Sequence, residues 1–316
     1  MEQSPAFATS VNKQKIVVIM GSTGAGKSRL SIDLATRYFK NSEIINSDKM
    51  QVYTGLDITT NKITMEEQFN VPHHLLSTID PTKTVLAPSD FRKLASEIIS
   101  DVKSRHGLPL VVGGSCSLIY SLVTNEFDPN SDVFNGPLPD PVSTELCYDC
   151  CFIWVDVCLP VLNQYLSKRV DEMLDAGMFK ELVDYFQSGE CERVFESGLG
   201  QSIGVPEFET YFKKFPDTPA DPNRKQISSS EDSDEENVEY NEAIRRIKEN
   251  TYVLAKKQVS KIAKLKDAGW NVKRIDATEV FRAAVTAECG SEKVAELWEK
   301  LVLERSVKIV EEFLAE

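Results

Sequence analysis

The sequence predicts an α/β protein in which a parallel sheet with flanking helices is followed by a mainly helical lobe. Strand-like and helical patterns alternate before about residue 125, which is typical of a parallel sheet covered on both faces. Apolar residues then recur at helical spacing after residue 160. A glycine-rich phosphate-binding motif stands between the first strand and the first helix. We expect a flexible N-terminus over residues 1–14, an α/β core over 15–160 and a helical lobe over 161–316.

The phosphate-binding motif occupies residues 21–28, directly after an apolar strand at 16–20. Its glycines let backbone N–H groups point at phosphate oxygens, and the helix that follows adds the positive end of its dipole. Lys27 adds a cation, and the Ser28 hydroxyl is a ligand for Mg²⁺. All fixed positions of the motif are filled, which predicts a P-loop NTPase-like core and disfavours a glycine-rich turn without a ligand. The expected phosphate-binding residues are Gly21, Ser22, Thr23, Gly24, Ala25, Gly26, Lys27 and Ser28.

A second early strand, at residues 43–48, ends in Asp48 and runs into a polar segment that continues to Thr60. A polar segment directly after a buried strand is typical of a substrate loop. The strand at 108–112 ends in glycine, glycine and Ser115, not in the acid that holds the metal in many phosphoryl-transfer proteins. The phosphate loop by itself leaves a small kinase, an ATPase and a non-catalytic nucleotide-binding switch as alternatives.

Five segments of the chain together resemble one enzyme family. These segments are residues 46–60, 71–76, 112–115, 203–207 and 251–258. In this order they are similar to the isopentenyl (dimethylallyl) transferases that act on adenine, and most of all to the plant adenylate isopentenyltransferases, which make cytokinin precursors. The matches extend from about residue 15 to about residue 262, and together they are far more specific than the phosphate loop alone.

The resemblance implies that a dimethylallyl group is transferred from dimethylallyl diphosphate to N6 of ATP, ADP or AMP, with the donor diphosphate and Mg²⁺ on the phosphate loop. The N6 amine is a poor nucleophile because its lone pair is delocalised, so a carboxylate that takes its proton would help, and Asp48 is the candidate. A helix cap or a metal-associated acid is the other interpretation of Asp48. The resemblance also implies that Thr23 bonds the bridging oxygen of the donor. The expected acceptor-site residues are Asp48, Ser47, Thr60, Ser115, Lys256 and Lys257.

Lys256 and Lys257 belong to a lysine-rich segment of the expected helix at 240–268. Such a stripe could hold the acceptor phosphates, and a solvated face is an equally good interpretation. Tyr252 stands where the family often has Arg, which weakens a phosphate-binding role at that position. The acid-rich stretch near 221–239 is expected to be a disordered, solvated loop. Further helices are expected at 178–188, 205–214 and 292–314.

The tRNA-modifying members of the same family are the nearest alternative. They carry a long helical insertion that clasps the anticodon stem, and the interval between Ser115 and Arg169 leaves no room for it. The net charge of −13 also opposes the binding of a polyanion. We therefore expect a free adenine nucleotide as the acceptor, no tRNA partner, and a monomeric enzyme.

The composition agrees with a soluble intracellular enzyme of the plastid or the cytoplasm. No apolar run approaches the roughly twenty residues that cross a bilayer. Seven cysteines without framework spacing indicate reduced thiols. Cys147, Cys150 and Cys151 have no second pair at zinc-site spacing, so we predict a buried strand edge there. His73 and His74 either contact a substrate or pack within a loop.

Overall fold

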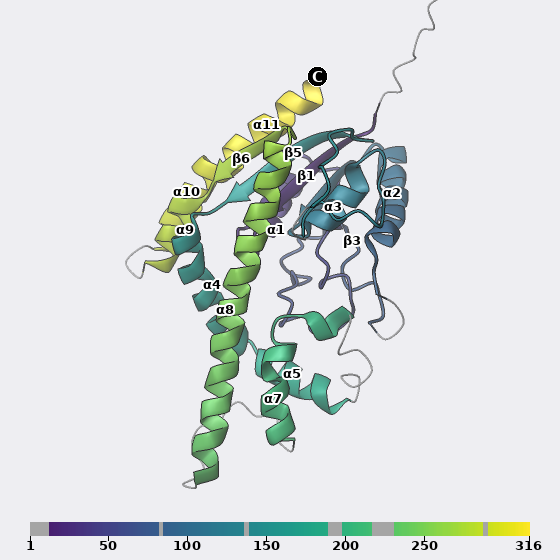
Figure 1. Ribbon diagram of the computed structural model, residues 1–316. Coiled ribbons are helices and arrows are strands. Elements are labelled where there is room, and N and C mark those ends of the chain that lie inside the picture. Colours follow the sequence, from purple (N-terminus) through teal and green to yellow (C-terminus); the bar gives the residue numbers. More distant parts are fainter. Residues whose placement is uncertain (1–12, 82–84, 136–138, 189–197, 217–230, 287–289) are drawn as a thin grey trace, which may run out of the picture.

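The computed structural model describes residues 13–81, 85–135, 139–188, 198–216, 231–286 and 290–316. The described strands form one sheet in the order β3-β2-β4-β1-β5-β6, and each neighbouring pair is parallel (Figure 1). The predicted parallel α/β architecture is therefore confirmed. The strands are β1 (Lys15–Gly21), β2 (Ser42–Asn46), β3 (His73–His74), β4 (Leu108–Gly113), β5 (Asp149–Asp156) and β6 (Val272–Asp276).

Helices connect and cover these strands. The expected helices at 178–188 and 205–214 are confirmed, and the one expected at 292–314 is divided by a π-helical turn. The α-helices are α1 (Lys27–Asp33), α2 (Pro88–Ser104), α3 (Cys116–Val123), α4 (Leu159–Asp175), α5 (Met178–Gln187), α7 (Val205–Lys214), α8 (Glu231–Asp267), α9 (Thr278–Val285), α10 (Ser291–Trp298) and α11 (Glu304–Ala315). Two π-helical segments, η1 (Leu34–Tyr38) and η4 (Glu299–Leu303), continue α1 and α10, and η2 (Gly198–Gln201) is a 3₁₀ turn.

The central strand β1 is buried on both faces, because successive side chains of a strand point to opposite sides. Ile16, Val18 and Met20 face one core, which α2, α3, α5, α7 and part of α8 complete. Val17 and Ile19 face a second core, which includes residues of α1, α4, α9, η4 and α11. Figure 1 shows α2 and α3 on one side of the sheet and α9, α10 and α11 on the other. The phosphate loop emerges from the middle of this sandwich.

The expected helical half also contributes a strand to the sheet. Strand β6 pairs in parallel with β5, from Phe152 opposite Val272 to Asp156 opposite Asp276. The chain thus leaves the sheet after β5, forms α4, α5, α7 and α8, and returns to the sheet at β6. Figure 1 shows α5, α7 and the N-terminal half of α8 extending away from the sheet. Strand β6 was not predicted, because its sequence is mainly polar: Lys273, Arg274 and Asp276 are exposed in the fold.

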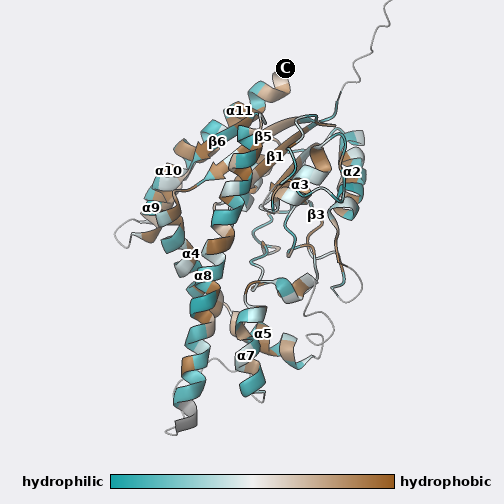
Figure 2. Ribbon diagram, viewed as in Figure 1, coloured by the Kyte–Doolittle hydropathy of each residue, from teal (hydrophilic) through white to brown (hydrophobic). Residues whose placement is uncertain are grey.

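The prediction of a disordered acidic loop near 221–239 is wrong for its described part. Helix α8 begins at Glu231 and contains 37 residues, and residues 221–230 lie outside the described residues. Glutamate favours helix formation, and partners on α7 neutralise its charge. Lys214 Nζ lies 2.6 Å from Glu239 Oε1 and 3.3 Å from Glu235 Oε1. Figure 2 shows the mainly hydrophilic N-terminal half of this helix.

The predicted strand edge near the cysteines is confirmed. Cys150 and Cys151 lie within β5, and burial raises the pKa of Cys151 to about 12. Among the described residues, no group of three or more His, Cys, Asp or Glu side chains could hold a metal ion. Helices that could cross a membrane are also absent from the described part of the chain.

Candidate active site

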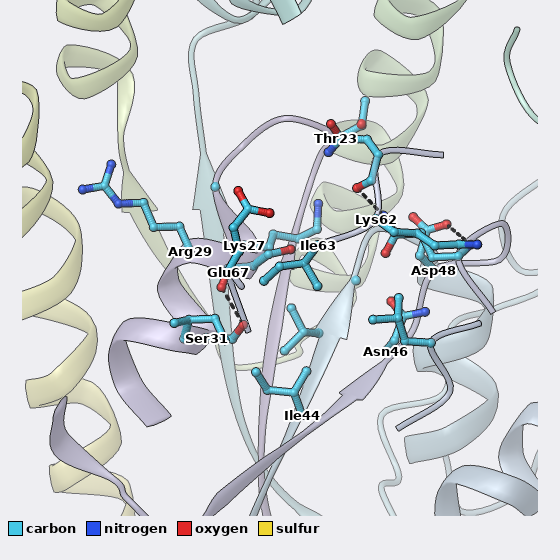
Figure 3. Close-up of a pocket in the computed structure, with 18 of the residues that line it drawn as sticks. Thr23, Lys27, Arg29, Ser31, Ile44, Asn46, Asp48, Lys62, Ile63 and Glu67 are labelled. Carbon is cyan, nitrogen blue, oxygen red and sulfur yellow. Dashed lines mark hydrogen bonds between the residues drawn. The ribbon is translucent and has the colours of Figure 1, made fainter. Parts of the chain in front are cut away.

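A cavity of about 620 Å³ lies beside the phosphate loop, at the carboxyl ends of β1, β2 and β4. Ligands of open α/β sheets bind at this edge, because the strand-to-helix turns and helix N-termini gather there. The cavity is lined by the phosphate loop, α1, the end of β2, the segment from Gln51 to Phe69, and α4. Figure 3 shows Arg29 on the opposite side of the cavity from Asp48 and Lys62.

The phosphate loop has the geometry that its motif predicts. It joins β1 to α1, and Gly24 and Gly26 have φ values of 75° and 91°, a region that glycine adopts without strain. A Cβ atom on Gly24 would lie 2.6 Å from Leu166 Cδ2, so the neighbouring helix also requires glycine. Thr23, Gly24, Gly26, Lys27 and Ser28 line the cavity. Gly21, Ser22 and Ala25 are buried and do not line it.

Lys27 is the cation at the centre of this loop. Its Nζ donates to the Ser22 carbonyl oxygen at 2.8 Å. Burial lowers its pKa from 10.5 to about 8, and the nearby Asp48 carboxylate opposes that shift. A buried ammonium with one hydrogen-bonded carbonyl is stabilised by an anion, so the loop is suited to a phosphate group.

Thr23 is held from two sides by residues that the sequence analysis did not assign to the site. Arg169 Nη2 donates to its hydroxyl at 2.9 Å, and its backbone N–H donates to Gln258 Oε1 at 2.7 Å. Within the described part of the chain the buried Nε of Arg169 has no hydrogen-bond partner, and burial lowers the pKa of this guanidinium. Arg169 interrupts the apolar stripe of α4, and that charge between Leu166 and Val170 was the available signal.

Asp48 follows β2 and lines the same cavity as Lys27. Its Oδ1 accepts hydrogen bonds from the backbone N–H groups of Met50 at 2.9 Å and Gln51 at 3.4 Å. Its Oδ2 has no hydrogen-bond partner among the described residues. One oxygen therefore stabilises the turn, as the capping interpretation expects, while the other remains available for a proton.

Of the predicted acceptor residues near Asp48, some line the cavity and others do not. Thr60 lines the cavity, but its hydroxyl donates to the Leu56 carbonyl oxygen at 2.7 Å. The buried Ser47 hydroxyl finds no hydrogen-bond partner in the segments that the structure describes, and it packs against Gly113, where an added Cβ would lie 2.3 Å away. Ser115 Oγ accepts from the Lys49 backbone N–H at 3.1 Å. Ser47 and Ser115 do not line the cavity, so their contacts here support the turn around Asp48.

Lys256 and Lys257 are exposed and do not line the cavity. Lys256 Nζ lies 5.7 Å from the centre of the Tyr252 ring. The residue by which this part of α8 contacts the phosphate loop is Gln258, which is buried. This glutamine lies within segment 251–258, but the acceptor role was predicted for the two lysines beside it.

The segment after Asp48 is held by its own hydrogen bonds. Lys62 Nζ donates to the carbonyl oxygens of Tyr53 at 2.6 Å and Gly55 at 2.7 Å, and to Asp57 Oδ1 at 2.6 Å. Gln51 Nε2 donates to the carbonyl oxygens of Thr60 at 3.1 Å and Asn61 at 3.0 Å. These bonds fix the wall of the cavity that faces the phosphate loop.

His73 and His74 separate into two roles. His73 lines the cavity, and its Nδ1 lies 2.8 Å from the Val71 carbonyl oxygen. Burial lowers the pKa of His73. His74 Nε2 instead lies 2.7 Å from Glu43 Oε2 and belongs to an ion-pair cluster with Arg105. Of the two, His73 is therefore the one that a substrate can meet.

The residues of the cavity fit a magnesium ion that arrives with a phosphate. Ser28 and Asp48 both line it and offer oxygen atoms, the ligands that Mg²⁺ prefers. Two such residues do not make a protein-only metal site, in agreement with the absence of a metal-binding cluster among the described residues. Phosphate oxygens and water would have to complete the coordination shell.

Fold and site together define an α/β phosphate-loop protein whose cavity places a carboxylate opposite an anion-binding loop. The chain belongs to a particular group within this class, the IPP transferase family, whose model matches residues 51–136 and 137–264. The predicted prenyltransferase family is thus confirmed.

Known proteins agree with this assignment. An adenylate isopentenyltransferase of Humulus lupulus is 50% identical over 94% of this chain and 90% of its own length. The chloroplastic adenylate isopentenyltransferase 1 of Arabidopsis thaliana is 46% identical over 100% of this chain and 85% of its own. A eukaryotic dimethylallyltransferase that acts on tRNA has a similar structure, with a TM-score of 0.74 and 24% identity over 96% of this chain and 80% of its own.

A bacterial structure bears on the expected missing insertion. The tRNA isopentenylpyrophosphate transferase of Bacillus halodurans has a TM-score of 0.67 and 25% identity, over 96% of this chain and 99% of its own. A match over nearly all of that chain gives no support to the expected absence of a long segment of the tRNA enzymes.

Proposed function

We propose that the enzyme transfers the dimethylallyl group of dimethylallyl diphosphate to N6 of a free adenine nucleotide, ATP, ADP or AMP, as the first step of cytokinin biosynthesis. The observation that carries the proposal is the identity of 50% with an adenylate isopentenyltransferase over 94% of this chain. The cavity supports it, because an anion-binding loop and a carboxylate face one space large enough for two small ligands.

The phosphate loop would hold the diphosphate of the donor. Lys27, the backbone N–H groups of the loop and Arg169 would meet negative charge that grows as the C1–O bond breaks, and this favours the transition state over the bound donor. Thr23, fixed by Arg169 and Gln258, would bond the bridging oxygen. Mg²⁺ beside Ser28 would add positive charge at the leaving diphosphate.

Asp48 would serve the acceptor. As the N6 lone pair forms a bond to C1 of the donor, the C1–O bond breaks and its electrons leave with the diphosphate. The N6 proton then passes to Asp48 Oδ2, the oxygen that has no partner among the described residues. The backbone bonds to Oδ1 hold the carboxylate in place during this transfer.

Product analysis tests the acceptor. Dimethylallyl diphosphate is incubated with the enzyme and an equimolar mixture of AMP, ADP, ATP and tRNA, and the products are identified by mass spectrometry. We expect N6-dimethylallyl nucleotides and unmodified tRNA. Modified tRNA would instead favour a tRNA dimethylallyltransferase, which the 99% coverage of the bacterial tRNA enzyme supports as the second candidate. Release of the γ-phosphate of ATP without a prenyl donor would favour a kinase.

We further propose a monomer located in the plastid or the cytoplasm. Arabidopsis relatives at 46% identity are named chloroplastic, and one at 40% identity is named mitochondrial. Light scattering on the purified enzyme tests the first statement, and a C-terminal fluorescent fusion tests the second.

A further inference from the structure

The phosphate loop rests on aromatic side chains from the far end of the chain. A Cβ atom on Gly26 would lie 2.8 Å from Trp298 Cη2 and 3.6 Å from Phe281 Cζ. Both rings are buried, and Tyr165, which lines the cavity, packs edge-on against Phe281 at 4.7 Å between ring centres. Gly26 therefore sits directly on an aromatic cluster with no space between them.

Trp298 also holds the helix that the loop begins. Its indole Nε1 donates to Asp33 Oδ2 at 2.8 Å, and the Arg29 guanidinium lies 4.4 Å from the centre of its ring. Both partners belong to α1 and lie one helical turn apart on the same face, with Arg29 Nε 3.9 Å from Asp33 Oδ2. A single side chain thus contacts Gly26, the N-terminal turn of α1 and the C-terminal residue of that helix.

A second contact also joins the C-terminal part of the chain to the helical segment that continues α1. Arg37 forms two hydrogen bonds of 2.7 Å to the carboxylate of Glu299. Arg37 belongs to η1 and Glu299 to η4, so two π-helical segments face each other where the helices meet. Such segments are rare and often mark functional sites, because they shift the side chains that follow by one position.

Neither contact belongs to the segments that identify the family. The family model ends at residue 264, and Trp298 lies beyond it. The Trp298 contact nevertheless reaches Gly26, which precedes the cation Lys27 and caps α1 in a left-handed conformation with a φ of 91°. The direction of the loop N–H groups depends on that conformation.

We propose that Trp298 is a positioning residue that fixes the phosphate loop in its anion-binding conformation, and so sets the affinity for the diphosphate of the donor. This inference rests on the proposed donor site. Removal of the indole leaves a space under Gly26 and frees one end of α1, and the loop must then be ordered again each time a diphosphate binds.

Trp270 provides a matched control. It is buried like Trp298, and its Nε1 donates to the Ser143 carbonyl oxygen at 2.9 Å, but it lies in the other core. Trp298→Phe and Trp270→Phe each remove one indole and one hydrogen bond. We expect Trp298→Phe to raise the Kd for dimethylallyl diphosphate and for inorganic diphosphate about tenfold, measured by calorimetry with Mg²⁺. Trp270→Phe should leave both Kd values within about twofold, with a similar loss of thermal stability.

Fluorescence tests the same contact without altering it. A protein in which Trp154 and Trp270 are replaced by Phe retains Trp298 alone, and its emission should change on addition of inorganic diphosphate. The matched protein that retains Trp270 alone should not respond.

Two results would overturn the inference, and they have different meanings. Equal diphosphate affinity of wild type and Trp298→Phe, or a silent Trp298, would contradict the positioning role and leave the donor site intact. A wild-type protein that binds no diphosphate would contradict the proposed donor site itself, and the inference with it.

Discussion

The phosphate loop and the segment after Asp48 face each other across one cavity. Each contains a lysine whose ammonium donates to a carbonyl oxygen of its own segment. The Lys62 side chain is 4% exposed, and its ammonium has three oxygen partners, all within residues 53–57. The Lys27 ammonium donates to one carbonyl, and burial lowers its pKa to about 8. Lys62 therefore has a structural role, whereas Lys27 forms no ion pair within hydrogen-bond distance among the described residues.

Lys27 and Lys62 show how a ligand-binding lysine differs from a structural one. Both are lysines in polar segments beside a strand end, so residue type and position do not distinguish them. The number of oxygen partners does, because a buried ammonium with few partners costs free energy that an anionic ligand recovers. Variants of these lysines, and of Asp48, which lines the cavity between the two segments, test this distinction.

The largest effect is expected at Asp48. Asp48→Asn keeps the shape and the acceptor for the Met50 N–H but cannot take a proton, so kcat should fall about 10²- to 10⁴-fold. Steady-state kinetics measure kcat, and calorimetry should show that dimethylallyl diphosphate still binds, with a Kd that changes far less than kcat, because its diphosphate rests mainly on the phosphate loop. Turnover near the wild-type rate would remove Asp48 from the role of base.

The second effect concerns Lys27, whose ammonium has one hydrogen-bond partner among the described residues. Lys27→Met should weaken donor binding about 10- to 100-fold, the worth of one charge-assisted hydrogen bond. The Kd for dimethylallyl diphosphate is measured by calorimetry, and thermal unfolding serves as the control. We expect little loss of stability in the absence of ligand, since a buried ammonium with a single partner is removed. A large loss of stability with an unchanged Kd would show that Lys27 is structural, as Lys62 is, and would contradict the distinction between the two lysines.

The pKa of Lys27 predicts a pH dependence. Below about pH 8 the free enzyme already carries the proton, and donor binding takes up none. Above that pH the free lysine is neutral, so binding requires proton uptake and affinity should fall by up to about tenfold per pH unit. Calorimetry between pH 7 and pH 9.5 measures this slope. Lys27→Arg, which stays charged over the range, corrects for ionisation of the ligand.

At Lys62 we expect a clear loss of stability and a smaller effect on donor binding than at Lys27. Lys62→Met leaves the Tyr53 and Gly55 carbonyl oxygens without their donor and should cost about 2–4 kcal/mol in the free energy of unfolding. The KM for the nucleotide should rise while the donor Kd stays constant. Asp57→Asn, which removes only the exposed partner, should cost under about 1 kcal/mol. An altered donor Kd in Lys62→Met would mean that the two segments are not independent.

The smallest effect is expected at Lys256 and Lys257. A contact between exposed charges is worth at most about 1 kcal/mol, or about fivefold. Lys256→Ala and Lys257→Ala should therefore raise the KM for ATP and ADP less than about fivefold and leave that for AMP unchanged. The two are tested separately, because adjacent helix positions point in different directions. A rise above tenfold would show that α8 moves toward the acceptor when it binds.

Elements whose structure depends on residues close together in the chain could be predicted from the sequence. The strand, loop and helix around residues 21–28 were predictable because their period, glycines and capping are local. The acidic start of α8 was misjudged because composition was weighed above the helix propensity of glutamate. Arg169, Gln258 and Trp298 were missed because each reaches the phosphate loop from more than a hundred residues away, and only the folded chain brings them there.

The late return of the chain to the sheet affects how the protein is made. Strand β5 ends at Asp156, and its neighbour β6 begins at Val272, so the ribosome must add more than a hundred residues in between. At synthesis rates of about 5–20 residues per second, β5 remains an unpaired edge for roughly ten seconds. Its apolar residues and open backbone groups are then available to other chains. A premature stop before residue 272 would make that exposure permanent, so such fragments should aggregate even though the phosphate loop is present in them.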